Sequence, residues 1–124
     1  MNLSHIALAG VLVLAAASAR ADDLYFHSSD GPMEIHIDQS GRVHGRYQQE
    51  SGAQRPGRLV GTAGGNGSLE GLWLQPKSDH PCGYPREGSY TWGRFTIGNA
   101  WGAYPYGSWG YCDEIPNRNW QIRR

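Results

Sequence analysis

The chain has 124 residues, and its 11 Lys and Arg residues balance 11 Asp and Glu residues, so the formal net charge is zero. Nucleic acids and anionic membrane surfaces select proteins with a basic excess, and the balance argues against both as partners. Eighteen glycines and seven prolines interrupt the sequence at short intervals. Since no helical period extends over three turns beyond the N-terminal segment, the sequence predicts a small all-β protein.

The first 21 residues are typical of an export signal. An apolar run from Ile6 to Ala17 follows a short polar start and leads to Ala19-Arg20-Ala21, the small-x-small pattern that signal peptidases cleave. This run is too short to cross a membrane. We expect cleavage after Ala21 and a mature chain of residues 22–124 that folds as one β domain. The expected location is the periplasm or the extracellular medium, without membrane insertion.

Eight short runs of alternating apolar and polar residues follow the leader. In chain order they are "LYFHS" (24–28), "MEIHID" (33–38), "RVHGRY" (42–47), "GRLVGTA" (57–63), "SLEGLWLQ" (68–75), "SYTWGRFTI" (89–97), "GSWGYC" (107–112) and "NWQIR" (119–123). Short strands separated by turn residues predict an antiparallel meander of about eight strands. The pattern suits a barrel and a sandwich equally, and both stay open.

The second and third runs predict a hairpin in a defined register. If Gln39, Ser40 and Gly41 form the loop, residues whose numbers sum to 80 lie opposite each other. One face then carries two opposite-charge pairs and the pair His36 and His44, while the other face is apolar. The two histidines, with Glu34 or Asp38, are weak candidates for a zinc site, and a solvated polar face explains them better.

Cys82 and Cys112 are the two cysteines of the chain. In an exported protein such a pair is most simply one disulfide, which would close a loop of about 30 residues and stabilise the fold by roughly 3–4 kcal/mol. A metal site built on the two thiolates would need further ligands and a reducing compartment, so the disulfide is the preferred interpretation.

Aromatic residues gather in the C-terminal half, where nine of the 14 lie between Tyr84 and Tyr111. Those on predicted strands are expected in the core, and a bulge at Gly93 would bring Trp92 and Phe95 to one side. The predicted core consists of Ile35, Ile37, Val43, Tyr47, Trp73, Trp92, Phe95, Trp109 and Trp120. An open barrel mouth lined by Trp92, Trp109 and Trp120 would favour a small-molecule ligand.

The segment "GNAWGAYPYG" is different, because its glycines and proline oppose a regular strand. Its rings Trp101, Tyr104 and Tyr106 are therefore the first candidates for ligand binding. The alternative is a loop that folds back over one end of the barrel. A second loop, "QPKSDHPCGYPREGS", adds the candidates Tyr84 and Arg86, which the disulfide would hold near the first loop.

A hydrolase could in principle use Asp79 and His80 with Ser78 or Glu87. Neighbours in sequence seldom aim at one point, however, and no Gly-x-Ser-x-Gly or comparable nucleophile motif is present. We therefore expect a protein that is not an enzyme and carries no cofactor.

The segments "DQSGRVHGRYQQESG" and "GRLVGTAG" resemble the early hairpins of avidin-like up-and-down barrels, in which a glycine-containing turn leads into a Gly-x-Tyr strand. The late residues Trp92, Trp109 and Trp120 fall where such barrels also carry rings. The resemblance covers about a third of the mature chain and implies the architecture. The long loop "PKSDHPCGYPREG" and the cysteine pair depart from that family, and its polar ligand contacts have no residue-by-residue counterpart here.

The sequence thus favours an exported binding protein whose aromatic loops recognise a carbohydrate or another flat, partly polar molecule. Two alternatives stay open. One is an inhibitor or immunity-type module that binds an envelope or extracellular protein through "PREG" or "AYPYG", and the other is a structural envelope protein.

Overall fold

The computed structural model describes residues 21–47, 56–76 and 78–124, so the predicted leader up to Arg20 lies outside the described residues. The described chain is all-β. Its nine strands are β1 (Asp22–Ser28), β2 (Gly31–Ile37), β3 (Arg42–Tyr47), β4 (Gly57–Ala63), β5 (Leu69–Leu74), β6 (Trp92–Gly98), β7 (Tyr106–Tyr111), β8 (Arg118–Trp120) and β9 (Ile122–Arg123). No helix long and apolar enough to cross a membrane occurs in this part of the chain.

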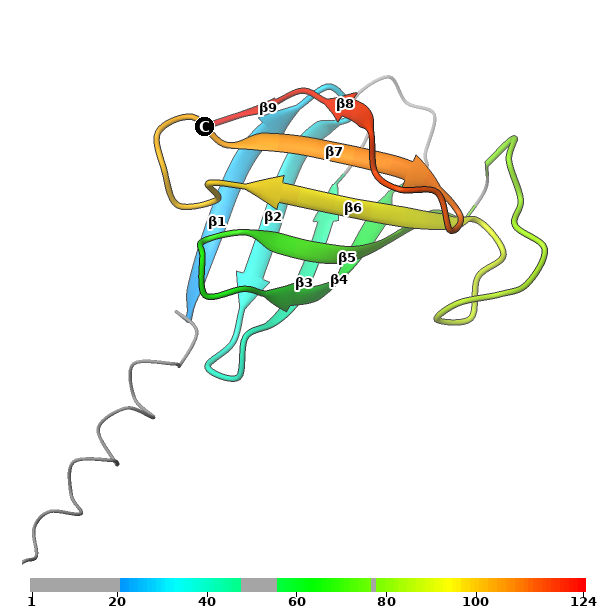
Figure 1. Ribbon diagram of the computed structural model, residues 1–124, viewed down its shortest axis with the longest axis horizontal. Helices are drawn as coiled ribbons and strands as arrows, with labels where there is room; N and C mark the ends of the chain where they lie inside the picture. The colour runs from blue at the N-terminus through cyan, green and yellow to red at the C-terminus, as the bar shows by residue number, and fades with distance from the viewer. Residues whose placement is uncertain (1–20, 48–55, 77) are drawn as a thin grey trace, which may run out of the picture.

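All nine strands belong to one antiparallel sheet in the order β8-β7-β6-β5-β4-β3-β2-β1-β9. Each strand from β1 to β7 therefore pairs with the next in sequence, as the predicted meander requires. Strands β5 to β7 run across β1 to β4 (Figure 1), so the sheet curves round on itself.

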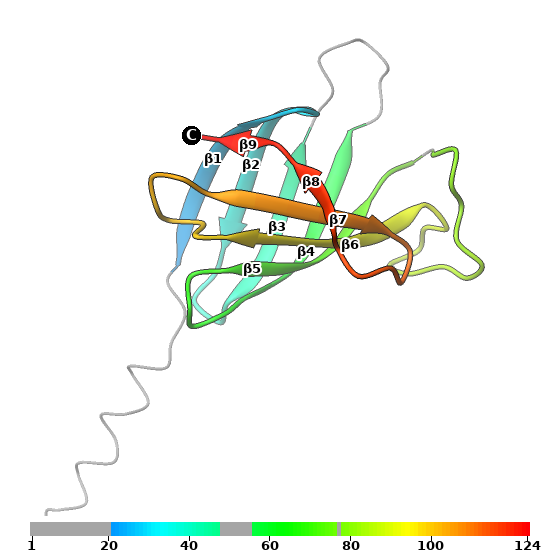
Figure 2. The same cartoon turned by 45° about the horizontal axis from the view of Figure 1, so that its top comes forward.

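The C-terminal segment brings the two edges of the sheet together. Its first part, β8, pairs with β7, and its second part, β9, pairs with β1 at Ser28 and His27. The single strand predicted at 119–123 is thus divided between two partners, as Figure 2 shows for the segment that crosses from β7 to β1. The result is a nearly closed barrel, which decides between the two predicted architectures.

The predicted register of the first hairpin is confirmed. Ile35 pairs with Gly45, His36 with His44 and Met33 with Tyr47. Gly41 adopts the left-handed conformation required of the last loop residue, with a φ of 86°. The opposite-charge pair Glu34 and Arg46 lies at 4.0 Å on the exposed face.

The barrel interior holds the main hydrophobic core. Alternate residues of β1 to β6 point inward, and the buried set is Leu24, Phe26, Met33, Ile35, Ile37, Val43, Tyr47, Leu59, Leu69, Trp73, Phe95, Ile97, Ala100 and Trp120. Among the predicted core residues in or against this cluster, only Trp109 is half-buried. Trp109 lies near the C-terminal end of β7, close to one end of the barrel.

Trp92 is buried, but not in the barrel interior. The pairing of β6 with β5 and β7 continues through Gly93 without a bulge, so Trp92 and Phe95 face opposite sides of the sheet. Trp92 packs with Leu74 and Cys82 in a second, smaller cluster. The expected bulge at Gly93, and with it a place for Trp92 inside the barrel, is therefore wrong.

Candidate functional site at the barrel mouth

One end of the barrel is open and forms a cavity of about 350 Å³. The C-terminal ends of strands β1, β3, β5 and β7 lie at this end of the barrel, together with β8. Rings make the wall, and polar side chains make the rim. The wall residues are Tyr47, Trp73, Trp109, Tyr111 and Trp120, and the rim residues are Asp30, Gln75, Ser78, Asp79 and His80. The volume is at the lower end of the range for small-molecule sites.

Trp73 is held in the wall from two sides. Its indole Nε1 donates a hydrogen bond to the carbonyl oxygen of Gly110 at 3.0 Å. Its ring makes edge-on contacts with Trp109 and Tyr111, each at 6.0 Å between centroids. Gly93 lies opposite Trp73 on β6, and a Cβ there would lie 2.4 Å from the Trp73 ring. The glycine is therefore what allows this ring to lie flat against β6.

Tyr47 closes the inner part of the wall. Gln75 Nε2 donates to the Tyr47 hydroxyl oxygen at 3.0 Å, and the Tyr47 ring makes an edge-on contact with Trp120 at 5.4 Å. Burial raises the pKa of Tyr47 well above its ordinary value, and the nearby charge of Asp30 adds to this while the Gln75 bond opposes it. The phenol therefore stays protonated and keeps its own hydrogen as a donor.

Trp120 carries an unsatisfied donor. The residue is 4% exposed, and its Nε1 has no hydrogen-bond partner among the residues that the structure describes. The other buried indoles differ, because Trp73 bonds to Gly110 and Trp92 bonds to the carbonyl oxygen of Tyr84 at 2.8 Å. A buried donor without an acceptor costs about 1–3 kcal/mol, so the indole nitrogen of Trp120 carries such a cost within the described residues.

The rim is formed by the loop that follows β5. The Ser78 hydroxyl accepts a hydrogen bond from the backbone N–H of His80, which folds the loop over the mouth. The His80 ring then stacks on Tyr111 with 4.1 Å between centroids. Because Ser78 is engaged with the backbone and His80 with a ring, the contacts of these two residues hold the loop in place, and their side chains form no Ser–His pair among the described residues.

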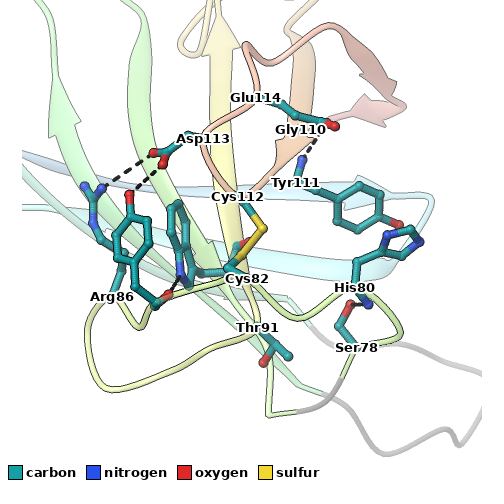
Figure 3. Close-up of a disulfide and its surroundings, with 12 residues drawn as sticks. Ser78, His80, Cys82, Arg86, Thr91, Gly110, Tyr111, Cys112, Asp113 and Glu114 are labelled. Carbon is teal, nitrogen blue, oxygen red and sulfur yellow. Dashed lines mark hydrogen bonds and ion pairs between the residues drawn. A yellow bond between two sulfur atoms is a disulfide. The ribbon is translucent and has the colours of Figure 1, made fainter.

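The disulfide holds this loop to the barrel, as predicted. Cys82 and Cys112 are joined across 30 positions, and Cys112 directly follows β7. On one side of the bridge Tyr111 and His80 lie together, and on the other side Arg86 approaches Asp113 (Figure 3). The Tyr84 hydroxyl donates to the Asp113 carboxylate at 2.5 Å, and Arg86 lies 3.9 Å from the same group.

The predicted ligand-binding residues are separated by the structure. Tyr84 and Arg86 lie in the disulfide loop beside the mouth, while Trp101 and Tyr104 lie in the loop between β6 and β7, at the opposite end of the barrel (Figure 1). The disulfide therefore does not bring the two loops together. Tyr106 is the first residue of β7 rather than part of the loop.

Within the β6–β7 loop the rings have different surroundings. Trp101 is half-buried against the main core and donates from Nε1 to the Asp22 carboxylate at 3.0 Å. Tyr104 and Tyr106 are 85% and 66% exposed. Trp101 therefore fits the alternative of a loop that folds back over one end of the barrel. Tyr104 and Tyr106 are the exposed rings expected of a binding loop.

Sequence reasoning found only part of this site. Trp109 and Trp120 were considered both as core and as lining of an open mouth, Tyr47 and Trp73 were predicted only as core, and Asp30 and Gln75 were assigned no role. A signal was available in the strand ends, because Tyr47, Trp73 and Trp109 share the inward parity near the last residue of alternate strands. Rings at such positions line a barrel mouth rather than its middle.

Two other features lie on the outer face of the barrel, a hollow and a histidine–aspartate contact. A wider hollow of about 740 Å³ lies on the outer face of β3 to β6, where Arg42, Arg94 and Glu70 alternate in charge. His36 Nδ1 lies 2.5 Å from Asp23 Oδ1. Within the described ranges, no group of three metal-ligating side chains occurs.

Comparison with known proteins identified no family model, no curated protein and no solved structure that matches this chain. The avidin-like resemblance therefore rests on the quoted hairpin segments alone and stays a prediction.

Proposed function

We propose that this chain is an exported, non-catalytic binding protein that holds a small, flat, partly polar molecule in the mouth of its barrel. The observation that carries the proposal is the cavity wall of five rings. Rings supply apolar area with little loss of side-chain freedom, and a few placed polar groups orient the ligand.

The site is also preorganised. Trp73 is fixed by its bond to Gly110, Tyr47 by Gln75, and Tyr111 by the stacked ring of His80. Walls that need no rearrangement spare a ligand the entropic cost of ordering them. The disulfide between Cys82 and Cys112 supports the location, because such bonds persist in oxidising compartments such as the periplasm and the extracellular medium.

Indole N–H resonances in NMR spectra test the proposal directly. We expect a screen of monosaccharides and flat heterocycles to yield ligands that shift the Trp73 and Trp120 resonances. Trp109→Ala should weaken such ligands at least tenfold, whereas Tyr104→Ala with Tyr106→Ala at the far end should leave them unchanged. The site assignment is wrong if binding survives Trp109→Ala in a protein shown to be folded and is lost with the two tyrosines.

A protein partner is the second candidate, supported by the exposure of Tyr104 and Tyr106 at the other end of the barrel. Exposed tyrosines are frequent anchors in protein interfaces. An inhibitor or immunity-type role predicts that Tyr104→Ser with Tyr106→Ser abolishes binding of an extracellular protein, while Trp109→Ala does not. If Trp109→Ala abolishes binding and the tyrosine variant does not, the binding site is the mouth.

A further inference from the structure

The rim of the mouth carries negative charge. Asp30 and Asp79 line the cavity, and no Lys or Arg is among its described lining residues. Neither carboxylate is in an ion pair with any residue of the described ranges. Arg118 lies nearby, but its charge is balanced by Glu114 at 3.5 Å. An entering ligand would therefore meet two carboxylates that form no ion pair with the described residues, in front of an aromatic wall.

The rings of the wall already attract a cation. The Arg118 guanidinium lies 5.4 Å from the centroid of Trp109 and 5.0 Å from that of Tyr111. The face of an aromatic ring is the negative end of its quadrupole, so a cation inside the cavity would be stabilised in the same way on a wall ring that has a free face. Tyr111 already has the Arg118 guanidinium and the stacked His80 ring against it. The carboxylates and the rings thus select the same sign of charge.

The chemistry of the rim also favours a planar cation with N–H donors. A carboxylate binds two parallel N–H groups of a guanidinium or an amidinium, and such planar groups stack on aromatic rings. A quaternary ammonium would use the rings alone and leave Asp30 and Asp79 without hydrogen bonds. The small cavity, about 350 Å³, suits a compact molecule of this kind.

We propose that the mouth selects a compact, planar organic cation of the amidinium or guanidinium class, held by Asp30 and Asp79 at the rim and by the aromatic wall of the cavity. The inference rests on the proposed function, because it names the ligand class of the same site. It goes beyond that function, which a neutral sugar or heterocycle would satisfy as well.

Benzamidine and benzamide form a matched pair for the test, since they share shape and size and differ in charge. Titrated at pH 8 against the oxidised protein, benzamidine should bind at least about tenfold more tightly than benzamide, in line with a cation held by desolvated rings and carboxylates. Benzoate, an anion of similar shape, should bind more weakly than either. Calorimetry and the indole resonances of Trp73 and Trp120 give two independent measures.

The double variant Asp30→Asn with Asp79→Asn assigns the preference to the rim. It should reduce the difference between benzamidine and benzamide to threefold or less, chiefly by weakening benzamidine. The control is Asp23→Asn with Glu34→Gln, which removes the same charge from the outer face of β1 and β2 and should keep the full preference.

The outcomes separate the two proposals. Equal affinity for benzamidine and benzamide, both lost in Trp109→Ala, overturns the cation inference and leaves a ligand site at the mouth. The same conclusion follows if the control variant loses the preference as fully as the rim variant, because net charge then explains it. If none of the three probes shifts the Trp73 or Trp120 resonance, the inference fails, and the monosaccharide and heterocycle screen then decides the proposed function.

Discussion

Tryptophan residues show how one residue type takes different roles in this small barrel. The indole nitrogens of Trp73, Trp92 and Trp101 all donate hydrogen bonds, and each bond joins two segments far apart in sequence or ties a loop to a strand. Trp120 lies equally deep but has no acceptor within the described chain. Trp120 therefore contributes to the fold through the packing of its ring on Tyr47 and Phe95, whereas the other three also contribute a hydrogen bond.

Trp73→Phe and Trp120→Phe form a matched pair that tests this distinction. Both remove an indole and nearly the same volume, but only Trp73→Phe leaves the Gly110 carbonyl without its donor. We expect Trp73→Phe to lower the free energy of unfolding by about 1 kcal/mol or more beyond the loss in Trp120→Phe, because an unmade buried hydrogen bond costs that much. Urea unfolding of both variants measures the difference, and equal losses would contradict the assignment.

Asp38 stabilises the turn between β2 and β3 through its ionised form. A hydrogen bond from the Ser40 side chain, with others from backbone N–H groups, lowers the pKa of Asp38 to about 2 from 3.8. A pKa that is lowered in the folded state contributes stability above the unfolded pKa, and the contribution disappears as the pH falls through the folded pKa.

We therefore expect the turn to be fully stabilised above pH 4 and to weaken between pH 4 and pH 2, as the cited shift requires. An NMR titration of the Asp38 carboxyl checks the value, and amide exchange at Arg42, whose N–H bonds to this carboxylate, reports the turn. Asp38→Asn is the control and should show no such change over this range. A titration of the Asp38 carboxyl near pH 4 would contradict the prediction.

Glycines allow close contacts between neighbouring strands in two ways. In the first, an aromatic ring covers a glycine of the neighbouring strand, as Tyr47 covers Gly57 and Tyr106 covers Gly98. This contact gives the exposed Tyr106 a structural role besides any binding role. In the second, two glycines of neighbouring strands lie opposite each other, as Gly61 of β4 and Gly71 of β5 do.

Gly61→Ala should be strongly destabilising. The added methyl group would lie 2.0 Å from the carbonyl oxygen of Glu70, and backbone cannot move aside as a side chain can. We expect a loss of about 2 kcal/mol or more in the free energy of unfolding, as for overpacked cores. Gly65→Ala is the control, because nothing lies within 4 Å of a Cβ there, and it should change stability by less than about 1 kcal/mol.

The whole molecule has two ends with different construction. At the mouth, a loop held by the disulfide and by the stacked His80 frames a cavity. At the far end, Trp101 is tied to Asp22, and Arg124 donates to the carbonyl oxygens of Ala100 and Gly102. The far end is therefore closed by contacts of β1 and of the C-terminal Arg124 with a loop, which leaves the mouth as the open end.

Removing the disulfide should loosen the mouth selectively. We expect Cys82→Ala with Cys112→Ala to lower the free energy of unfolding by about 3 kcal/mol, the value for a closed loop of this length. Amide exchange should rise most in residues 78–91, while the hairpin of β2 and β3 keeps its protection. Reducing agent added to the double variant should have no further effect. A loss below 1 kcal/mol would show that packing on Trp92 holds the loop alone.

Much of the architecture could be predicted from local pattern. Alternating residues gave the strand positions, and Gly41 with the two opposite-charge pairs gave the register of the first hairpin, because a shift by one residue would turn every apolar side chain outward. The cysteine pair gave the disulfide. The side of the sheet on which Trp92 lies could not be predicted, since it depends on whether Gly93 forms a bulge, and both arrangements suit the local sequence.

The candidate site was the least predictable part, because it depends on which strand ends meet. Tyr47, Trp73, Trp109 and Trp120 come from four different strands and become neighbours only when the sheet closes. By itself, the sequence determined an all-β meander with one cross-link, since alternation, turn residues and cysteine count are properties of short segments. Only the tertiary structure decided that the meander forms a nearly closed barrel with rings around its open end. The physical reason is that closure depends on the sum of twist and bending over all strands, and on the pairing of the C-terminal segment with both edges.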